Sequence, residues 1–237
     1  MEYELEARSG LEQWKRKMEK RSGFLNRTAK SAQTKLNQWI PEKVQAVITE
    51  SVKKMVQGAL YSSEFLTKEQ YPQHLSLQEK EDLIRKKLER SKKIATAEGA
   101  GTGAGGLFLG LADFPLLLSI KMKFLFEAAA IHGYDTEAPF ERSFILHVFQ
   151  LAFSSEEHRQ KMLTVIEGWQ ENPVSPDAID WRVLQQEYRD YLDFVKMMQL
   201  VPGIGAAVGA YANYNLLEQL GETAIQAYRI RYFSSGK

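Results

Sequence analysis

Three carboxylates beside or inside apolar stretches are the residues best placed to do chemistry: Glu98, Asp113 and Glu127. A carboxyl group buried among apolar side chains has a raised pKa, so it can serve as a general acid or bind a metal ion. If these three groups met, the chain would be a hydrolase or a metal-dependent enzyme. The sequence favours a structural alternative, in which Asp113 caps a helix and the two glutamates join hydrogen bonds between helices.

Other catalytic and metal-binding patterns are missing from the sequence. The four histidines, His74, His132, His147 and His158, do not pair at a spacing of three or four residues, and neither H-E-x-x-H nor G-x-S-x-G occurs. The chain has no cysteine, which excludes disulfides and thiolate metal sites and is typical of a reducing compartment. We therefore expect no metal and no cofactor, and we favour a non-enzymatic role, with an enzyme as the alternative.

The segment "EGAGTGAGGLFLGLADFP", residues 98–115, is rich in glycine and contains a literal G-x-G-x-x-G. A dinucleotide site needs a strand before that motif, whereas here the charged helical stretch "RKKLERSKKIATAE" precedes it. No Gly-Lys-Ser/Thr follows, so a P-loop is excluded as well. We expect this segment to bind no nucleotide.

A membrane hairpin is a second interpretation of the glycine-rich segments. Gly99–Ile120 has one charge, Asp113, and Met197–Leu217 has none, and each is long enough to cross about 30 Å as a helix. An Asp in the middle of a span opposes insertion by roughly 2.5–3.5 kcal/mol, and Pro115 interrupts the helix. An integral hairpin therefore stays an alternative rather than the preferred structure.

Close helix packing explains the glycines best. Without Cβ atoms, glycines spaced four apart let two helix backbones approach each other, which compensates for their low helix propensity. We expect the two glycine-rich segments to pack together as the central pair of the fold. The glycines expected at this contact are Gly101, Gly105, Gly106, Gly110, Gly205 and Gly209.

Helical signals recur along the chain, and they predict a single all-α domain of nine or ten helices. Capping boxes are expected at Ser76–Glu79 and Ser154–Glu157, and Gly133 is expected to stop a helix. Pro139 fits the first turn of another helix. Ser175 is expected to cap a helix that runs through Met198.

The charge distribution divides the chain into a basic amphipathic region, residues 1–40, and a helical domain, residues 41–237. Residues 13–40 hold eight Lys/Arg and one acid, whereas residues 140–200 hold ten acids and six bases. Basic amphipathic helices bind anionic bilayer surfaces; the alternative is that their apolar side packs on the core. Nucleic acid is not expected, because no RNA-recognition motif accompanies the charges. The residues expected at the membrane surface are Trp14, Lys15, Arg16, Lys17, Lys20, Arg21, Phe24, Arg27, Lys30, Lys35 and Trp39.

Four stretches resemble the EcsC family of bacteria: "TAEGAGTGAGGLFLGLADFPLLL", "FEAAAIHGYD", "ERSFIL" and "VPGIGAAVGAYANYNLLEQLGETA". The resemblance covers roughly residues 40–232. It implies a helical protein whose operon also encodes an ABC-transporter ATPase and its membrane subunit, a transporter associated with protein secretion and competence. No catalytic residues come with the resemblance.

These observations together predict a non-enzymatic accessory protein of such an operon. The first residues, "MEYELEARSGLEQWKRKMEK", lack the apolar region of a secretory signal, so we expect a cytoplasmic location, in solution or at the inner face of the cell membrane. The expected partners are an anionic membrane surface and the ABC transporter.

Overall fold

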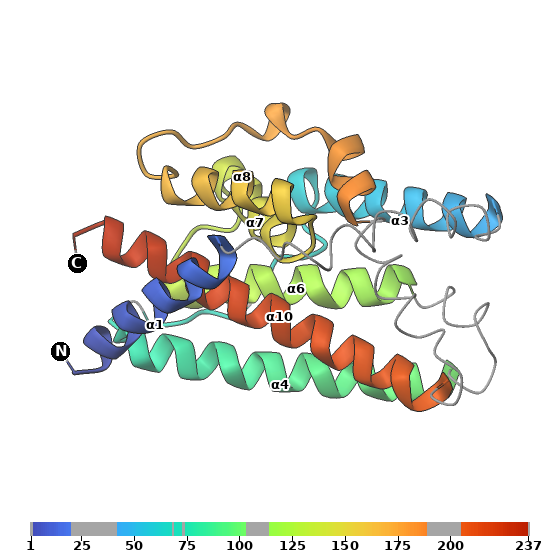
Figure 1. The fold of residues 1–237 in the computed structure, drawn as a ribbon, viewed down its shortest axis with the longest axis horizontal. Coiled ribbons are helices and arrows are strands. Elements are labelled where there is room, and N and C mark those ends of the chain that lie inside the picture. The colour runs from blue at the N-terminus through green and yellow to red at the C-terminus, as the bar shows by residue number, and fades with distance from the viewer. Residues whose placement is uncertain are drawn as a thin grey trace.

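The regular secondary structure of the described residues is entirely helical, which confirms the all-α class predicted from the sequence (Figure 1). The computed structural model describes residues 2–19, 42–67, 69–72, 74–102, 114–188 and 205–236. Within those ranges there is no strand, and a further helical run covers residues 181–188. The elements are α1 (Glu2–Glu19), α3 (Glu42–Tyr61), α4 (Leu77–Thr102), α6 (Phe114–His132), α7 (Pro139–Ala152), α8 (Glu156–Glu167), the 3₁₀ turn η2 (Pro176–Ala178) and α10 (Gly205–Ser234).

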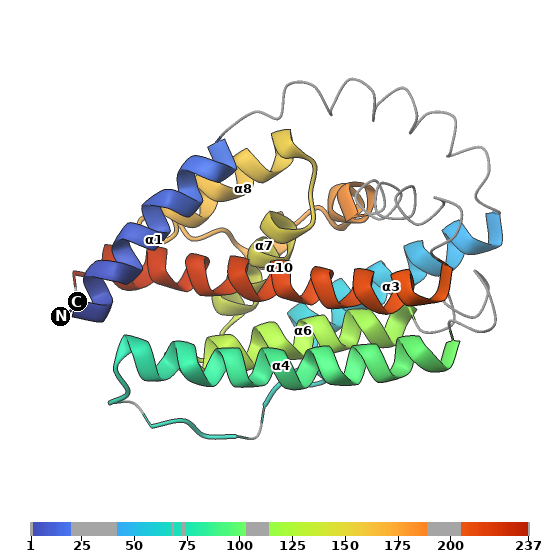
Figure 2. The same cartoon turned by 60° about the horizontal axis from the view of Figure 1, so that its bottom comes forward.

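Three long helices form the centre of the bundle. Helices α4 and α10 run antiparallel along each other, and α6 packs on both (Figures 1 and 2). Helix α3 covers α6, α7 packs against α8, and α1 lies on α10 near the C-terminus. The last turn of α4 and the first turn of α10, which belong to the two glycine-rich segments, lie at the same end of the bundle.

A glycine of α10 lets the two central helices approach each other. A Cβ atom built on Gly221 would lie 2.3 Å from Cδ2 of Leu88 in α4 and 2.9 Å from its Cδ1. Such distances are far below van der Waals contact, so a larger residue would push the helices apart. The sequence predicted close contact through other glycines and did not single out Gly221.

Several predicted helix boundaries are confirmed by their hydrogen bonds. At the start of α4, the Ser76 backbone N–H donates to Glu79 Oε2 (2.8 Å), and the Glu79 N–H donates to Ser76 Oγ (3.3 Å). Gly133 follows the last residue of α6 with a φ of 87°, the left-handed conformation that glycine adopts without strain. Pro139 stands in the first turn of α7, as expected.

Two predicted boundaries were wrong. Helix α8 is capped by Ser155, whose Oγ accepts from the His158 N–H (3.4 Å), and not by Ser154. Ser175 precedes only the short turn η2. The next helix begins at residue 181, and Asp180 caps it, because its Oδ1 accepts a hydrogen bond from the Arg182 N–H (2.9 Å). In both places a neighbouring residue of similar capping chemistry took the role, because side-chain caps are local and tolerate a shift along the chain.

Helix α7 lies deep in the bundle, and every residue from Glu141 to Ala152 is buried. Its polar side chains therefore need partners inside the protein. Arg142 donates from Nη1 to the Ser62 carbonyl (2.6 Å) and from Nε to the Thr136 carbonyl (3.1 Å), and His147 Nδ1 lies 2.8 Å from the Ser143 carbonyl. The bond to Ser62 attaches α7 to the loop after α3, and the bond to Thr136 attaches it to the loop that precedes α7.

None of the helices in the described ranges combines the length and the apolar composition needed to cross a bilayer. The two stretches considered as an integral hairpin, Gly99–Ile120 and Met197–Leu217, fall partly outside those ranges.

Candidate functional site

Of the three candidate catalytic carboxylates, only the side chain of Glu127 falls within the described part. It lies on α6, with 15% of the side chain exposed, and its Oε1 is 3.6 Å from Lys87 Nζ on α4. Lys87 also pairs with Glu69, so Glu127 takes part in an ion-pair group that joins α4 to α6. The side chain of Glu98, near the end of α4, and all of Asp113 lie outside the described residues, so the convergence of the three carboxylates stays an alternative hypothesis. Among the described residues, no group of three or more His, Asp or Glu could hold a metal ion.

The predicted membrane-surface residues that lie in the described part of the chain differ in how far they are exposed to solvent. Trp14 is only 7% exposed and belongs to the hydrophobic core, and Lys15 Nζ pairs with Glu167 Oε1 of α8 (2.8 Å). Arg16 and Lys17 are exposed. The contacts of Trp14 agree with the alternative in which the apolar side of this helix packs on the core. Outside the described residues lie Lys20, Arg21, Phe24, Arg27, Lys30, Lys35 and Trp39.

The predicted glycine contact is described in part. Gly101 belongs to α4, and Gly205 and Gly209 belong to α10, the two helices that pack together. Gly105, Gly106 and Gly110 lie outside the described residues, so a direct contact between the glycine sets stays a prediction.

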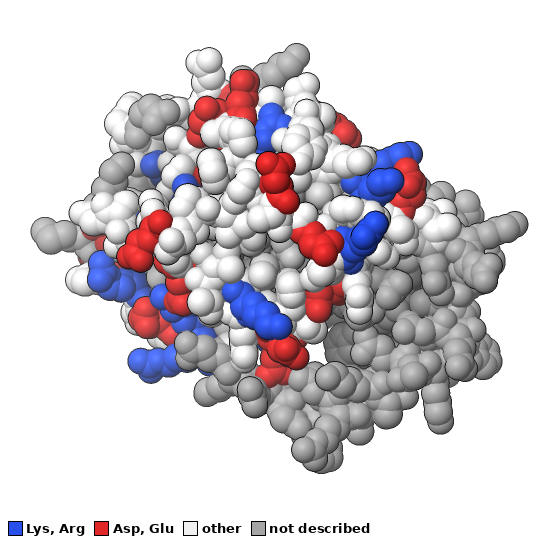
Figure 3. Space-filling view, turned by 90° about the horizontal axis from the view of Figure 1, so that it is seen from above, with Lys and Arg blue, Asp and Glu red and all other residues white. Residues whose placement is uncertain are grey.

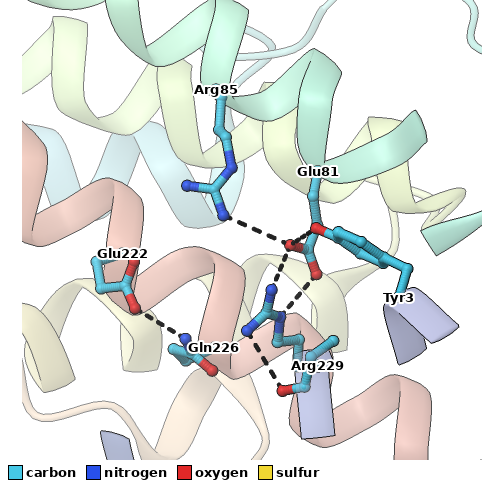
Figure 4. Close-up of polar contacts among 7 residues, drawn as sticks. Tyr3, Glu81, Arg85, Glu222, Gln226 and Arg229 are labelled. Atoms are coloured by element: carbon cyan, nitrogen blue, oxygen red, sulfur yellow. Dashed lines mark hydrogen bonds and ion pairs between the residues drawn. The ribbon is translucent and has the colours of Figure 1, made fainter. Parts of the chain in front are cut away.

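A buried ion pair joins three helices on one side of α10 (Figure 4). Arg229 donates from Nε and Nη2 to the two oxygens of Glu81 in α4, at 2.7 and 2.6 Å. Arg229 Nη1 also reaches the Ala7 carbonyl of α1 (3.3 Å), and Tyr3 Oη donates to Glu81 Oε2 (2.6 Å). Burial alone would lower the pKa of Arg229, but its hydrogen bonds to Glu81 raise that pKa above the ordinary value. This paired geometry holds α1 onto the central helices.

A second buried pair lies on another side of α10, because residues two apart on a helix point in different directions. Arg231 Nη1 donates to Glu141 Oε2 of α7 (2.6 Å), and Tyr228 Oη donates to Glu141 Oε1 (2.9 Å). The Arg231 guanidinium lies 3.6 Å from the centre of the Tyr134 ring. Burial raises the pKa of Glu141 although Arg231 lowers it. The fold therefore uses both arginines to connect helices.

The sequence analysis did not identify Glu81, Arg229 or Arg231 as important, and Glu141 entered it only as the first residue of the stretch "ERSFIL". A signal was present: Arg229 and Arg231 interrupt the apolar stretch "AIQAYRIRYF" near the end of the last helix. Charges within an apolar helix face require buried partners, which the sequence cannot identify.

Lys121 is a buried amine on α6 that the sequence analysis also missed. Only 4% of it is exposed; its Nζ donates to Tyr188 Oη (2.9 Å) and lies 4.9 Å from the centre of the Phe153 ring. Burial lowers the pKa of Lys121 from 10.5 to about 7. An amine with such a pKa is partly neutral near pH 7, because an apolar environment disfavours the charged form.

The exposed face of α4 carries a row of cations, which we call the α4 basic stripe: Arg85, Lys86, Arg90 and Lys93. Their spacing places them along the solvent side of the helix, where with Glu89 they line a shallow hollow of about 400 Å³. Ile94, which is 43% exposed, continues this face toward the glycine-rich end of α4.

The face over α8 and the loop after it has a different character. Acidic and basic side chains are interspersed there (Figure 3), whereas α4 lies on the other side of the bundle in Figure 1. The four cations of the stripe outnumber Glu89, and such an excess of positive charge attracts a surface of opposite sign, whereas evenly mixed charges largely cancel. The α4 basic stripe is therefore the candidate functional site of the described chain.

Comparison with known proteins identifies relatives along nearly the whole chain. The model of the EcsC protein family matches residues 6–233. Protein EcsC of Bacillus subtilis (strain 168) is 52% identical over 219 residues, which cover 92% of each chain. The protein of the same strain named uncharacterized protein YdbA is 33% identical over 141 residues, 58% of this chain and 52% of that relative. No solved structure matches this chain.

Proposed function

We propose that this chain, which belongs to the EcsC protein family, is a non-enzymatic accessory protein of an ABC transporter linked to protein secretion. In this proposal it acts at the cytoplasmic face of the cell membrane. The transporter context comes from the family resemblance, and the α4 basic stripe is the observation that supports attachment to the membrane surface.

The α4 basic stripe carries enough positive charge for reversible attachment to an anionic membrane surface. Each Lys or Arg near an anionic leaflet contributes about 1 kcal/mol to the binding free energy, so four cations would contribute roughly 4 kcal/mol. Repulsion between the leaflet and the Glu89 carboxylate reduces this sum. Salt screens such an attraction within about 8 Å at physiological ionic strength. Binding should therefore require anionic lipid and weaken at high salt.

Co-sedimentation with vesicles tests the attachment. Wild-type protein is mixed with vesicles of phosphatidylcholine alone or with added phosphatidylglycerol, at low and at high salt. A triple variant, Lys86→Gln, Arg90→Gln and Lys93→Gln, removes three charges of the stripe and spares Arg85, which lies 3.7 Å from buried Glu81. The matched control removes three exposed cations elsewhere, with Lys123→Gln, Lys161→Gln and Arg182→Gln.

The expected result is that anionic vesicles retain the wild type and the control at low salt and release the stripe variant. Three lost contacts of about 1 kcal/mol correspond to a loss of affinity of roughly 100-fold. Equal retention of the stripe variant and the control would overturn the role of the stripe. The transporter part is tested separately, by co-purification of the tagged chain with the ABC transporter from the same operon.

A further inference from the structure

A groove of about 520 Å³ lies between α3 and α6. Met55 of α3, Phe65 of the following loop and Leu118 of α6 form its buried floor, each less than 5% exposed. Val47, which is 41% exposed, stands at its mouth. The volume falls within the range of ordinary ligand pockets, and the lining is mostly apolar.

The shape of the groove depends on a glycine of α3. A Cβ atom on Gly58 would lie 3.0 Å from Cε2 of Phe65 and 3.1 Å from Oε2 of Glu64, so a larger residue would require these side chains to shift by a few tenths of an ångström. The Phe65 ring in turn packs on the Phe126 ring of α6, with 5.9 Å between centroids. The groove is thus preformed by packing.

The polar rim of the groove is acidic. It contains Glu50, Lys54 and Glu64. Lys54 Nζ lies 3.6 Å from Glu50 Oε1, and in the described part of the chain no Lys or Arg pairs with Glu64. An apolar floor with a net negative rim complements a ligand that is apolar and carries positive charge.

We propose that this groove binds a peptide segment in which apolar residues are followed by Lys or Arg, the composition found where a transmembrane helix leaves the bilayer on its cytoplasmic side. Cytoplasmic flanks of membrane proteins are enriched in Lys and Arg, and apolar helix faces commonly dock into apolar grooves. An anionic lipid would meet repulsion from the rim. This inference rests on the proposed function, because only a protein at the cytoplasmic membrane face would meet such a segment.

Fluorescence anisotropy with two labelled peptides tests the proposal. One probe is a Leu/Ala helix followed by three Lys, and the other has three Glu in those places. The charge of the rim is reversed with Glu50→Lys and Glu64→Lys, and Ser119→Trp fills the groove from its partly exposed side. Glu171→Lys, on the exposed loop after α8, is the matched control, and thermal melting checks that each variant is folded.

The Lys-flanked probe should bind the wild type and the control at least about tenfold more tightly than the Glu-flanked probe. Each attraction between a Lys of the probe and a Glu of the rim raises the affinity a few-fold, and a Glu at the same place in the probe lowers it by a similar factor. The double reversal should invert this preference, and Ser119→Trp should abolish binding of both probes. Unchanged binding in either variant overturns the proposal. Binding of a fluorescent fatty acid in the groove, with no binding of either peptide, would identify it as a lipid site instead.

The vesicle assay separates this result from the proposed function. Ser119→Trp changes neither the α4 basic stripe nor the charge of the protein, so this variant should sediment with anionic vesicles as the wild type does. Vesicle binding without peptide binding refutes the groove alone, and peptide binding without vesicle binding refutes attachment through the stripe.

Discussion

Leu88 of α4 fills the space beside Gly221 of α10 that a side chain at position 221 would need, with its Cδ2 at 2.3 Å from the position of a Cβ atom. The contact sets the distance between the two central helices. The Cγ atom and both Cδ atoms of Leu88 lie within 3.1 Å of that position, and the side chain is 5% exposed, so it has little room to move.

Gly221→Ala should therefore destabilise the protein by about 1–3 kcal/mol, because overpacking outweighs the gain of about 1 kcal/mol from the better helix former. Urea unfolding followed by circular dichroism measures the change. Leu88→Ala in the same chain should relieve part of the strain, so the double variant should be more stable than the two separate losses predict. At Gly168, where the nearest atom to an added Cβ is 3.5 Å away, the same substitution should change stability by less than about 0.5 kcal/mol.

Arg229→Met should destabilise the protein by about 3–5 kcal/mol, because buried Glu81 would lose both charged hydrogen bonds and keep only Tyr3 and the more distant Arg85. The variant that also carries Glu81→Leu should recover much of this loss, since no unpaired charge remains. The free energies of unfolding of the four proteins in this cycle give the coupling between the two residues. Equal losses in the single and double variants would contradict a structural role for the pair.

Lys121 should make stability depend on pH in a specific window. Its pKa is about 7 in the folded protein, lowered by burial from 10.5, so between these values the unfolded chain holds more protons. Burial of Lys121 therefore opposes folding fully below about pH 7, and the penalty fades as the pH rises toward 10.5. Lys121→Met should stabilise the protein by about 2 kcal/mol at about pH 7 and by less at about pH 9.5.

Urea unfolding of both proteins at the two pH values checks this expectation. Lys123→Met, on an exposed position of the same helix, is the control and should leave stability nearly unchanged at either pH. A gain from Lys121→Met that does not depend on pH would show that the amine is not the titrating group.

Trp14→Ala tests which of the two interpretations of the first helix holds. Because the indole is 7% exposed and packs in the core, its removal should destabilise the fold by about 3–5 kcal/mol. Leu5→Ala, at a position that is 70% exposed on the same helix, should change stability by less than about 0.5 kcal/mol. If Trp14→Ala leaves thermal stability intact and instead weakens vesicle binding, the indole is a membrane contact.

The sequence by itself determined the features that depend on neighbouring residues. The all-α class, the capping box of Ser76 and Glu79, and the stop at Gly133 were predicted correctly, because their interactions span only a few residues. At α8 the same local chemistry was available to Ser154 and to Ser155, and the sequence could not choose between them.

Only the tertiary structure decided which distant residues meet. Arg229 pairs with Glu81 across 148 positions and Arg231 with Glu141 across 90, and Gly221, which the sequence analysis did not name, faces Leu88. Such contacts arise from the relative placement of whole helices, which no local pattern of residue types encodes. The sequence therefore specified the helices, and packing decided which side chains became buried ion pairs, core or exposed surface.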